Sequence, residues 1–209
     1  MNLLNPLFDP SLEAALVTGA GNGIGRAIAH ALVGEGMRTV FADIRQDAIA
    51  AAVATSPRPE LAIAWVGDLA SHEACDDLLA AAQSAVGQVT HFVHSAAPQR
   101  HEADHALAVT TETWERMRAV NVDAGFHLAR ELARQLIASG QLGSFLMLTS
   151  LHAGTPRNLP HVRDWFRFCA RDHPGLSMVP WGDDWFKGRN VRRCLAVTVK
   201  PERTSNART

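Results

Sequence analysis

Short apolar runs and longer amphipathic stretches alternate along the first 150 residues. The apolar runs predict strands at Ala14 to Thr18, Arg38 to Ala42, Leu61 to Val66, Val89 to His94 and Ser144 to Thr149. Helical spacing predicts helices at Ile24 to Gly34, Asp47 to Ala54, Ser71 to Val86 and Thr111 to Ser139, with Ser71 and Thr111 as caps. The runs are nearly all apolar, as in strands buried on both faces. We therefore predict a doubly wound parallel α/β sheet with helices on both faces.

The character of the sequence changes after His161. Residues 162–209 hold three of the five tryptophans and eight arginines but only three alanines, and periodicity is poor apart from a strand predicted at Cys194 to Val199. We divide the chain into a domain over 1–161 and an atypical tail over 162–209, which is an incomplete or altered part of the same domain. Translation of GC-rich DNA out of frame enriches arginine, tryptophan, cysteine and proline, so one hypothesis is a change of reading frame near codon 161.

Composition excludes several classes of function. The formal net charge is −1, which gives no electrostatic case for a nucleic-acid or membrane-surface partner. The three cysteines form no CxxC pair, so we expect no zinc site and a reducing, cytoplasmic location. We find no signal peptide and no run near the roughly 20 apolar residues of a membrane span. Four histidines cluster in the sequence without an HExxH pattern, and we interpret them as solvated loop side chains rather than metal ligands: His91, His94, His101 and His105.

A glycine-rich turn lies between the first predicted strand and the first predicted helix. It reads Thr18-Gly19-Ala20-Gly21-Asn22-Gly23-Ile24-Gly25. Glycines let the backbone turn sharply and approach a pyrophosphate, and the helix N-terminus offers it free N–H groups. Ligands of such sheets bind at the carboxyl ends of the strands, where this turn is placed. The pattern therefore predicts a dinucleotide site.

The spacing TGxxxGIG resembles that of the short-chain dehydrogenase/reductases, and further segments agree with that family in order. These are FADI with Asp43, GDLA with Asp68, HSAA at His94 to Ala97, NVDAGFHLARE with Asn121, and FLMLTSLHAGTP with Ser150. The resemblance covers about residues 12 to 161. It implies a Rossmann-like fold whose first 161 residues bind a dinucleotide.

The resemblance also implies a role for each matching residue. Those that would cradle the cofactor phosphates are Gly19, Asn22, Gly23, Ile24 and Gly25. Asp43 would accept hydrogen bonds from the adenosine ribose and repel a 2′-phosphate, so NAD is preferred over NADP, although Arg45 stands nearby. Asp68 and Leu69 would flank the adenine, and Ser95 and Ala96 would line the ribose side. Simpler alternatives remain open: Asp43 as an ordinary strand-end carboxylate and Asp68 as a helix N-cap.

Two residues resemble the family's catalytic groups. Asn121 would support a proton relay, and Ser150 would bind the carbonyl or alcohol of a small substrate. Alternatively, Asn121 satisfies backbone groups at a helix kink, and Ser150 is a loop hydroxyl. The implied reaction is hydride transfer between NAD(H) and an alcohol/carbonyl pair. Members of the family are commonly dimers or tetramers, so we expect a homodimer or homotetramer.

The sequence departs from the family at its acid/base pair. The chain contains no tyrosine, and Val162 and Phe166 occupy the best-aligned places of the Tyr-x-x-x-Lys motif. Histidines are possible substitutes, but no lysine is near enough to assist them: His152, His161 and His173. The enzyme interpretation therefore competes with a second one, in which the chain is an NAD-binding pseudoenzyme or an interaction protein.

Overall fold

The computed structural model describes residues 9–98, 109–148, 176–180 and 194–199. The strands are β1 Ala14–Thr18, β2 Arg38–Asp43, β3 Ala62–Val66, β4 His91–His94, β5 Gly143–Leu148, β6 Leu176–Pro180 and β7 Cys194–Val199. The helices are α1 Gly23–Gly34, α2 Gln46–Ala54, α3 His72–Val86, α4 Thr111–Arg118 and α5 Gly125–Ser139, with a π-helical segment at Ala119–Ala124 between the last two. Short 3₁₀ turns lie at Pro10–Leu12 and Pro59–Leu61.

The strands form one sheet in the order β3-β2-β1-β4-β5-β7-β6. The five strands from β3 to β5 are parallel, which confirms the predicted sheet. The two C-terminal strands differ, because β7 pairs antiparallel with β5 and β6 pairs antiparallel with β7. The strand predicted at Cys194–Val199 is confirmed, and it extends the same sheet.

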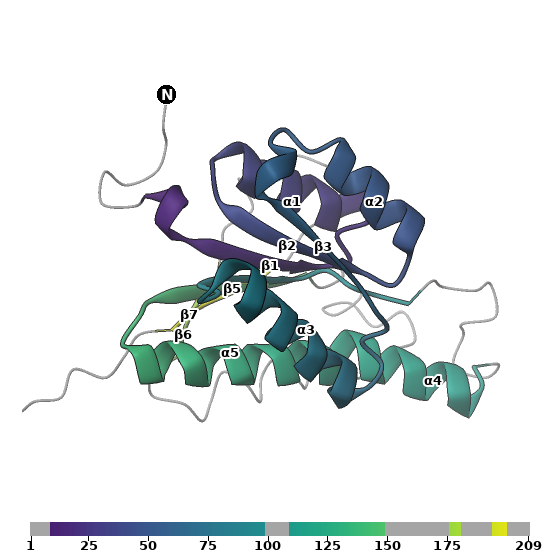
Figure 1. Ribbon diagram of the computed structural model, residues 1–209. Helices are drawn as coiled ribbons and strands as arrows, with labels where there is room; N and C mark the ends of the chain where they lie inside the picture. Colours follow the sequence, from purple (N-terminus) through teal and green to yellow (C-terminus); the bar gives the residue numbers. More distant parts are fainter. Residues whose placement is uncertain (1–8, 99–108, 149–175, 181–193, 200–209) are drawn as a thin grey trace, which may run out of the picture.

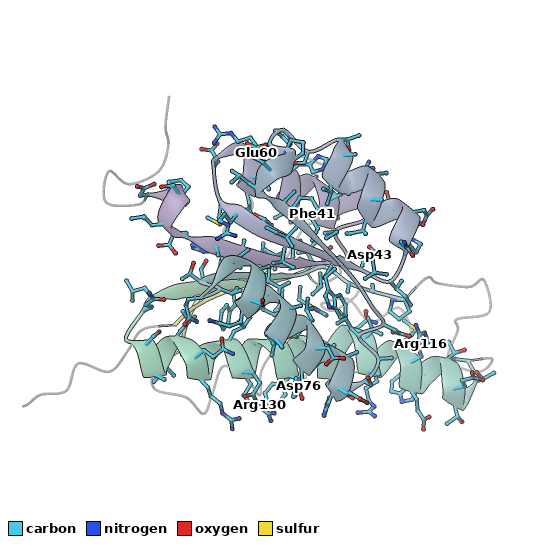
Figure 2. All side chains as sticks on the ribbon, viewed as in Figure 1. Phe41, Asp43, Glu60, Asp76, Arg116 and Arg130 are labelled. Atoms are coloured by element: carbon cyan, nitrogen blue, oxygen red, sulfur yellow. The ribbon has the colours of Figure 1, made fainter. Side chains whose placement is uncertain are left out.

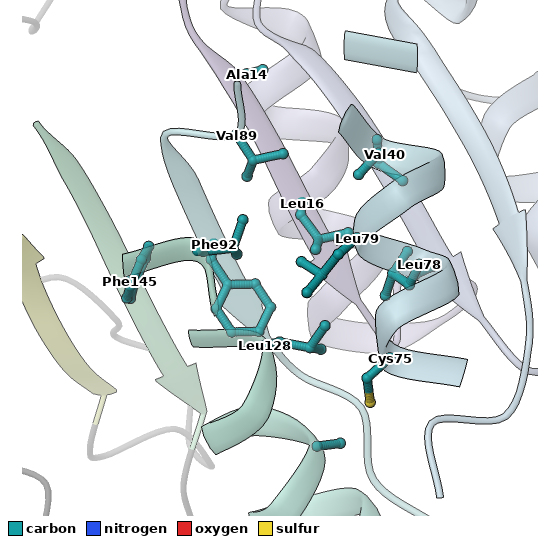
Figure 3. Packing of buried hydrophobic residues seen from close by; sticks show 14 of the residues in the cluster. Ala14, Leu16, Val40, Cys75, Leu78, Leu79, Val89, Phe92, Leu128 and Phe145 are labelled. Carbon is teal, nitrogen blue, oxygen red and sulfur yellow. The ribbon is translucent and has the colours of Figure 1, made fainter. Parts of the chain in front are cut away.

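Helices cover both faces of the sheet (Figure 1), with α1 and α2 on one face and α3 and α5 on the other. Each face has its own apolar core. The larger core joins α3 and α5 to strand residues that include Leu16 and Phe92, as Figure 3 shows. The smaller core packs α1 and α2 around Phe41 and Val17. The predicted apolar stripe of the long helix is buried from Val120 to Leu136 and points into the larger core.

Three local predictions need correction or refinement. The cap before Thr111 is Thr110, whose side chain accepts from the Thr113 N–H at 3.2 Å, so Thr111 is already helical. The predicted continuous helix is interrupted by the π-helical segment, which changes the hydrogen-bond register for six residues. Strand β3 is not buried on both faces, because it is the edge of the sheet and none of its residues is fully buried. The predicted cap at Ser71 is confirmed by a bond from the Ala74 N–H.

Within these described ranges, no helix has the length and apolar character that crossing a membrane requires. Gly19 and Asp43, which the sequence assigns to one site, lie at the carboxyl ends of β1 and β2. Asn121, assigned to the same site, follows Val120, which lines one hollow with Gly19 and Asp43.

Candidate functional site

An open hollow lies at the carboxyl ends of β1, β2, β3 and β4, with a volume of about 430 Å³ when the adjoining open solvent is included. Its walls come from segments far apart in the sequence, among them Gly19, Asp43, Asp68, Ala96 and Val120. Figure 2 shows Asp43 at the end of the sheet that faces α4, and Arg116 on that helix below it. This is the end of a parallel sheet at which nucleotides bind.

The glycine turn is closed against backbone rather than against flexible side chains. Gly19 has φ +68°, and a Cβ there would lie 2.8 Å from the backbone of Ser95 and Ala96. A Cβ on Gly25 would overlap the Gly19 carbonyl oxygen and lie 2.8 Å from its carbon. Gly23 has φ +54° and open space beside it, and its N–H donates to Asn22 Oδ1 at 2.7 Å, which caps α1. The turn therefore leaves backbone N–H groups of the helix start next to an open surface.

Asp43, the last residue of β2, lines the hollow, and two backbone N–H groups hold its carboxylate in place. Its Oδ2 accepts from the Gly21 N–H at 2.9 Å, and its Oδ1 accepts from the Arg45 N–H at 3.0 Å. The side chain is 11% exposed, and Arg45 Nε lies 3.8 Å from Oδ1. A Cβ on Gly21 would lie 2.8 Å from the carboxylate, so glycine is required for this approach. The carboxylate is thus held rigidly at the rim, with its charge partly balanced by Arg45.

Asp68 and Leu69 follow β3 and lie next to the end of β2. Asp43 pairs with Val66, and the Gly67 N–H donates to the Asp43 carbonyl oxygen at 3.1 Å. Ser71 caps α3, so the alternative interpretation of Asp68 as that cap is wrong. Instead, Asp68 Oδ1 accepts from the Ala70 N–H at 3.1 Å, and Oδ2 pairs with Arg116 Nη2 at 2.9 Å. Leu69 also lines the hollow and is 6% exposed. Arg116 was not predicted, because no sequence spacing relates a residue of α4 to the end of β3.

His94 contradicts its interpretation as a solvated loop side chain. It ends β4 and is 4% exposed, because the ring packs between the sheet and α5. Burial lowers the pKa of His94 to about 4, although the hydrogen bond to the Val120 backbone acts in the opposite direction. His91 also belongs to β4 rather than to a loop, and burial lowers its pKa too. His101 and His105 lie outside the described residues.

The two residues after β4 are held by the first strand. Thr18 Oγ1 accepts from the Ser95 N–H at 3.2 Å and from the Ala96 N–H at 3.3 Å. Ala96 lines the hollow, and Ser95 Oγ lies beside Gly25, where an added Cβ would be 3.1 Å away. The turn after β4 is therefore fixed directly against the glycine turn.

Of the two catalytic candidates, only Asn121 falls within the described residues. It lies in the π-helical segment, next to Val120, which lines the hollow. Ser150, Val162 and Phe166 lie outside the described residues, as do His152, His161 and His173. Asn121 is next to the lining residue Val120, and five of the residues predicted to bind the cofactor line the same hollow: Gly19, Asp43, Asp68, Leu69 and Ala96. The others do not line it: Asn22, Gly23, Ile24 and Gly25 lie at the start of α1, and Ser95 lies beside Gly25.

Two other kinds of chemistry find no support in the described ranges. No group of three or more histidine, cysteine or acidic side chains there is placed to hold a metal ion. Cys75 is buried in the larger core, and burial, followed by the charge of Asp76, raises the pKa of its thiol to about 11. A thiol that remains protonated is a poor nucleophile.

The residues of the hollow fit one half of a dinucleotide. The glycine turn packs so closely that a Cβ on Gly19 or Gly25 would meet backbone atoms, and it leads into the N-terminus of α1. A carboxylate acceptor follows at Asp43, and an apolar wall follows at Leu69 and Ala96. Backbone donors, then an acceptor, then an apolar wall are what pyrophosphate, ribose and adenine require in turn.

Known proteins share both this fold and this sequence pattern. The family model for short chain dehydrogenase matches residues 13–160. Galactitol 2-dehydrogenase (L-tagatose-forming) from Cereibacter sphaeroides is 36% identical over 147 residues, which cover 70% of this chain and 55% of that protein. Sorbitol dehydrogenase from the same organism is 32% identical over 138 residues, 66% of this chain and 52% of that protein. The chain thus spans about half the length of the curated relatives it matches.

Solved structures of the same family have a similar fold. A 3-ketoacyl-(acyl-carrier-protein) reductase from Brucella melitensis complexed with NADH has a TM-score of 0.63 at 28% identity, covering 70% of this chain and 60% of that one. Because the family model matches well over half of the residues, and the parallel sheet and glycine turn are those of the family, the chain belongs to the short chain dehydrogenase family.

Proposed function

We propose that this chain binds NAD in the hollow at the carboxyl ends of β1 to β4, and that it is an NAD-dependent oxidoreductase, impaired in this polypeptide, which transfers hydride between NAD(H) and a small alcohol or carbonyl substrate. The observation that carries the proposal is the rigid Asp43 carboxylate facing the same hollow as the glycine turn. When bound, the nicotinamide supplies or accepts the hydride. The similarity to polyol dehydrogenases supports the class of substrate.

The proposed contacts follow the walls of the hollow. The phosphates would meet the start of α1, formed by Gly19, Asn22, Gly23, Ile24 and Gly25. The adenosine ribose would donate to Asp43, and the adenine would lie against Asp68 and Leu69. Ser95 and Ala96 would line the ribose side of the cofactor. Asn121 and Ser150 would serve the substrate side, as a proton-relay support and a carbonyl-binding hydroxyl.

We expect NAD to bind more tightly than NADP, because the fixed carboxylate of Asp43 repels a 2′-phosphate. In Asp43→Ala the preference for NAD over NADP, expressed as the ratio of their dissociation constants, should fall by about tenfold or more, which is the order of one lost charge contact. NAD itself should also bind more weakly, because the Gly21 N–H loses its acceptor. The ratio of the two dissociation constants, measured by calorimetry, is therefore the readout.

A matched control for that experiment is Asp47→Ala. Asp47 is an exposed carboxylate in the first turn of α2, so its removal changes the net charge equally without touching the hollow. The control should keep the wild-type ratio. Equal or tighter binding of NADP by the unmodified protein contradicts the proposed cofactor preference.

The missing tyrosine and lysine favour a second candidate function, an NAD-binding pseudoenzyme or an interaction protein. The family match ends at residue 160, where the composition changes. This coincidence supports the hypothesis that the reading frame changes near codon 161, and that residues 162–209 are an altered part of the same domain. The coding DNA around codons 155 to 170 tests it. A shifted frame that encodes Tyr-x-x-x-Lys supports the hypothesis, and its absence contradicts it.

We further propose that the chain associates through the outer face of α5. The inner face of that helix is occupied by the larger core, whereas Phe126 and Ile137 are 36% and 54% exposed. A dimer or tetramer is expected by light scattering at micromolar concentration. A strictly monomeric mass contradicts this proposal.

A further inference from the structure

The buried ring of His94 connects two segments that border the hollow. One ring nitrogen, Nδ1, lies 2.9 Å from Thr18 Oγ1 at the start of the glycine turn. The other, Nε2, lies 3.0 Å from the Val120 carbonyl oxygen in the π-helical segment. Gly19, which follows Thr18, and Val120 both line the hollow. These partners are separated from His94 by 76 and 26 residues, so the ring is a connection between distant segments.

The partners determine which nitrogen carries the proton. A carbonyl oxygen only accepts, so Nε2 must donate to Val120. A neutral ring then has an unprotonated Nδ1, which accepts from the Thr18 hydroxyl. With its proton directed at Nδ1, Thr18 Oγ1 is free to accept from the Ser95 and Ala96 N–H groups. Burial, which lowers the pKa of His94, keeps the ring neutral at ordinary pH.

The helix beyond the π-helical segment is shaped to receive this ring. Gly125 begins α5, and a Cβ on it would lie 2.9 Å from His94 Cδ2 and 3.2 Å from Nε2. The helical backbone runs without a break from the π-helical segment into Gly125, and glycine inside a helix costs stability relative to alanine. At this position the missing side chain allows the close approach of the His94 ring. Thr18, the turn after β4, Val120 and Gly125 therefore all meet one imidazole.

We propose that His94 is a positioning residue that, as the neutral Nε2–H tautomer, sets the distance between the glycine turn and the π-helical segment and so the width of the nucleotide hollow. It touches neither cofactor nor substrate. It acts through Val120 and Thr18, and it aligns the segment that carries Asn121. This inference rests on the proposed NAD site, but the tautomer and the connection can be tested without any cofactor.

The first experiment measures the ring directly in the full chain. ¹⁵N-histidine NMR at pH 7 should show an unprotonated Nδ1 and a protonated Nε2 on His94. A protonated Nδ1, or a charged ring at that pH, overturns the proposal. NADH is not needed, so failure of the proposed cofactor site leaves this result intact.

The second experiment separates the two hydrogen bonds. His94→Asn keeps a polar group near Thr18 but is too short to reach Val120, whereas His94→Gln is long enough to donate to the Val120 carbonyl. Hydrogen exchange of the amides in Ala119–Ala124 should accelerate by about tenfold in His94→Asn, the scale of one buried hydrogen bond, and much less in His94→Gln. NADH affinity, followed by its fluorescence, should fall in the same order.

Two further variants complete the test. His91→Asn makes the same change at the other end of β4, where the ring contacts Ser144, and should leave exchange in the π-helical segment unchanged. Gly125→Ala should accelerate that exchange, although alanine favours helix, because the added methyl group displaces the ring. Unchanged exchange in both His94→Asn and Gly125→Ala overturns the proposal. Should His94→Asn fail to fold, His94→Gln and Gly125→Ala still decide it. If wild-type protein binds no NADH while the exchange results hold, only the proposed function fails.

Discussion

Replacing Gly25 with alanine is expected to abolish nucleotide binding and to destabilise the fold by about 2 kcal/mol or more, the scale of an overpacked core position. The new Cβ would overlap the carbonyl oxygen of Gly19 and lie 3.1 Å from Ser95 Oγ. The Gly19 carbonyl belongs to the backbone of a tight turn in which Gly19 has φ +68°, so this oxygen has little freedom to move away. The gain of about 1 kcal/mol in helix propensity from glycine to alanine does not offset this overlap.

The same helix supplies a matched control for Gly25→Ala. Gly34 is the last residue of α1, and a Cβ there would meet only Pro57 Cγ at an ordinary 3.9 Å. Gly34→Ala should therefore leave NADH binding unchanged and keep or slightly raise the melting temperature. Gly25→Ala should melt at least several degrees lower, since roughly 2–4 °C corresponds to 1 kcal/mol for a domain of this size. Equal melting and equal NADH affinity in the two variants contradict the close-packed turn.

The parts of the fold that depend on local pattern were predictable from the sequence. The bounds of β1 agree with the apolar run from Ala14 to Thr18, and the cap at Ser71 agrees with its position before a helical stretch. Both signals arise from neighbours in the chain: burial on two faces gives a continuous apolar run, and a free helix N–H selects a hydroxyl before it. The glycine-rich turn is also a local signal, because it lies directly between a strand and a helix, and it predicted where the candidate site lies.

Interactions between distant segments were not predictable. Arg116 pairs with Asp68 at the hollow, although nothing in their spacing relates the end of β3 to α4. His94 was interpreted as solvated because polar residues near a strand end usually are, yet two partners and a glycine on α5 give it a buried place. The π-helical segment also escaped prediction, since its apolar positions are compatible with an unbroken helix.

The antiparallel strands β6 and β7 were not predictable from the alternation of strands and helices. The rhythm of alternating strands and helices stops before them, so the sequence offered no basis for placing them in the sheet beyond the apolar run at Cys194–Val199. Strand β5 would otherwise end the sheet, and pairing with β7 satisfies its outer backbone groups. Any extended apolar segment could pair with the edge of β5 in this way. The pairing of β5 with β7 therefore says nothing about the reaction.

We expect the purified chain to reduce ketones and aldehydes with NADH far below the usual 1–10³ s⁻¹ of enzymes, even if NADH binds. A positioned acid/base supplies about 10²- to 10⁴-fold in rate, and the chain has no tyrosine to act as one. His94 is no substitute: it is buried, neutral and engaged by Val120 and Thr18. A spectrophotometric assay with NADH and a broad panel of ketones and aldehydes measures the rate.

The double variant Val162→Tyr with Phe166→Lys tests whether the defect lies at these two positions. If residues beyond 161 keep the family's arrangement, the pair should raise the rate toward the full factor of about 10² to 10⁴, because the lysine charge lowers the tyrosine pKa and so makes its proton easier to transfer. If the reading frame has changed there, restoring two side chains leaves their surroundings altered, and the rate should stay low. Val162→Phe with Phe166→Lys controls for the added ring and charge without a hydroxyl. Turnover in the usual enzyme range by the unmodified chain would contradict the assignment of the missing pair and direct attention to His161.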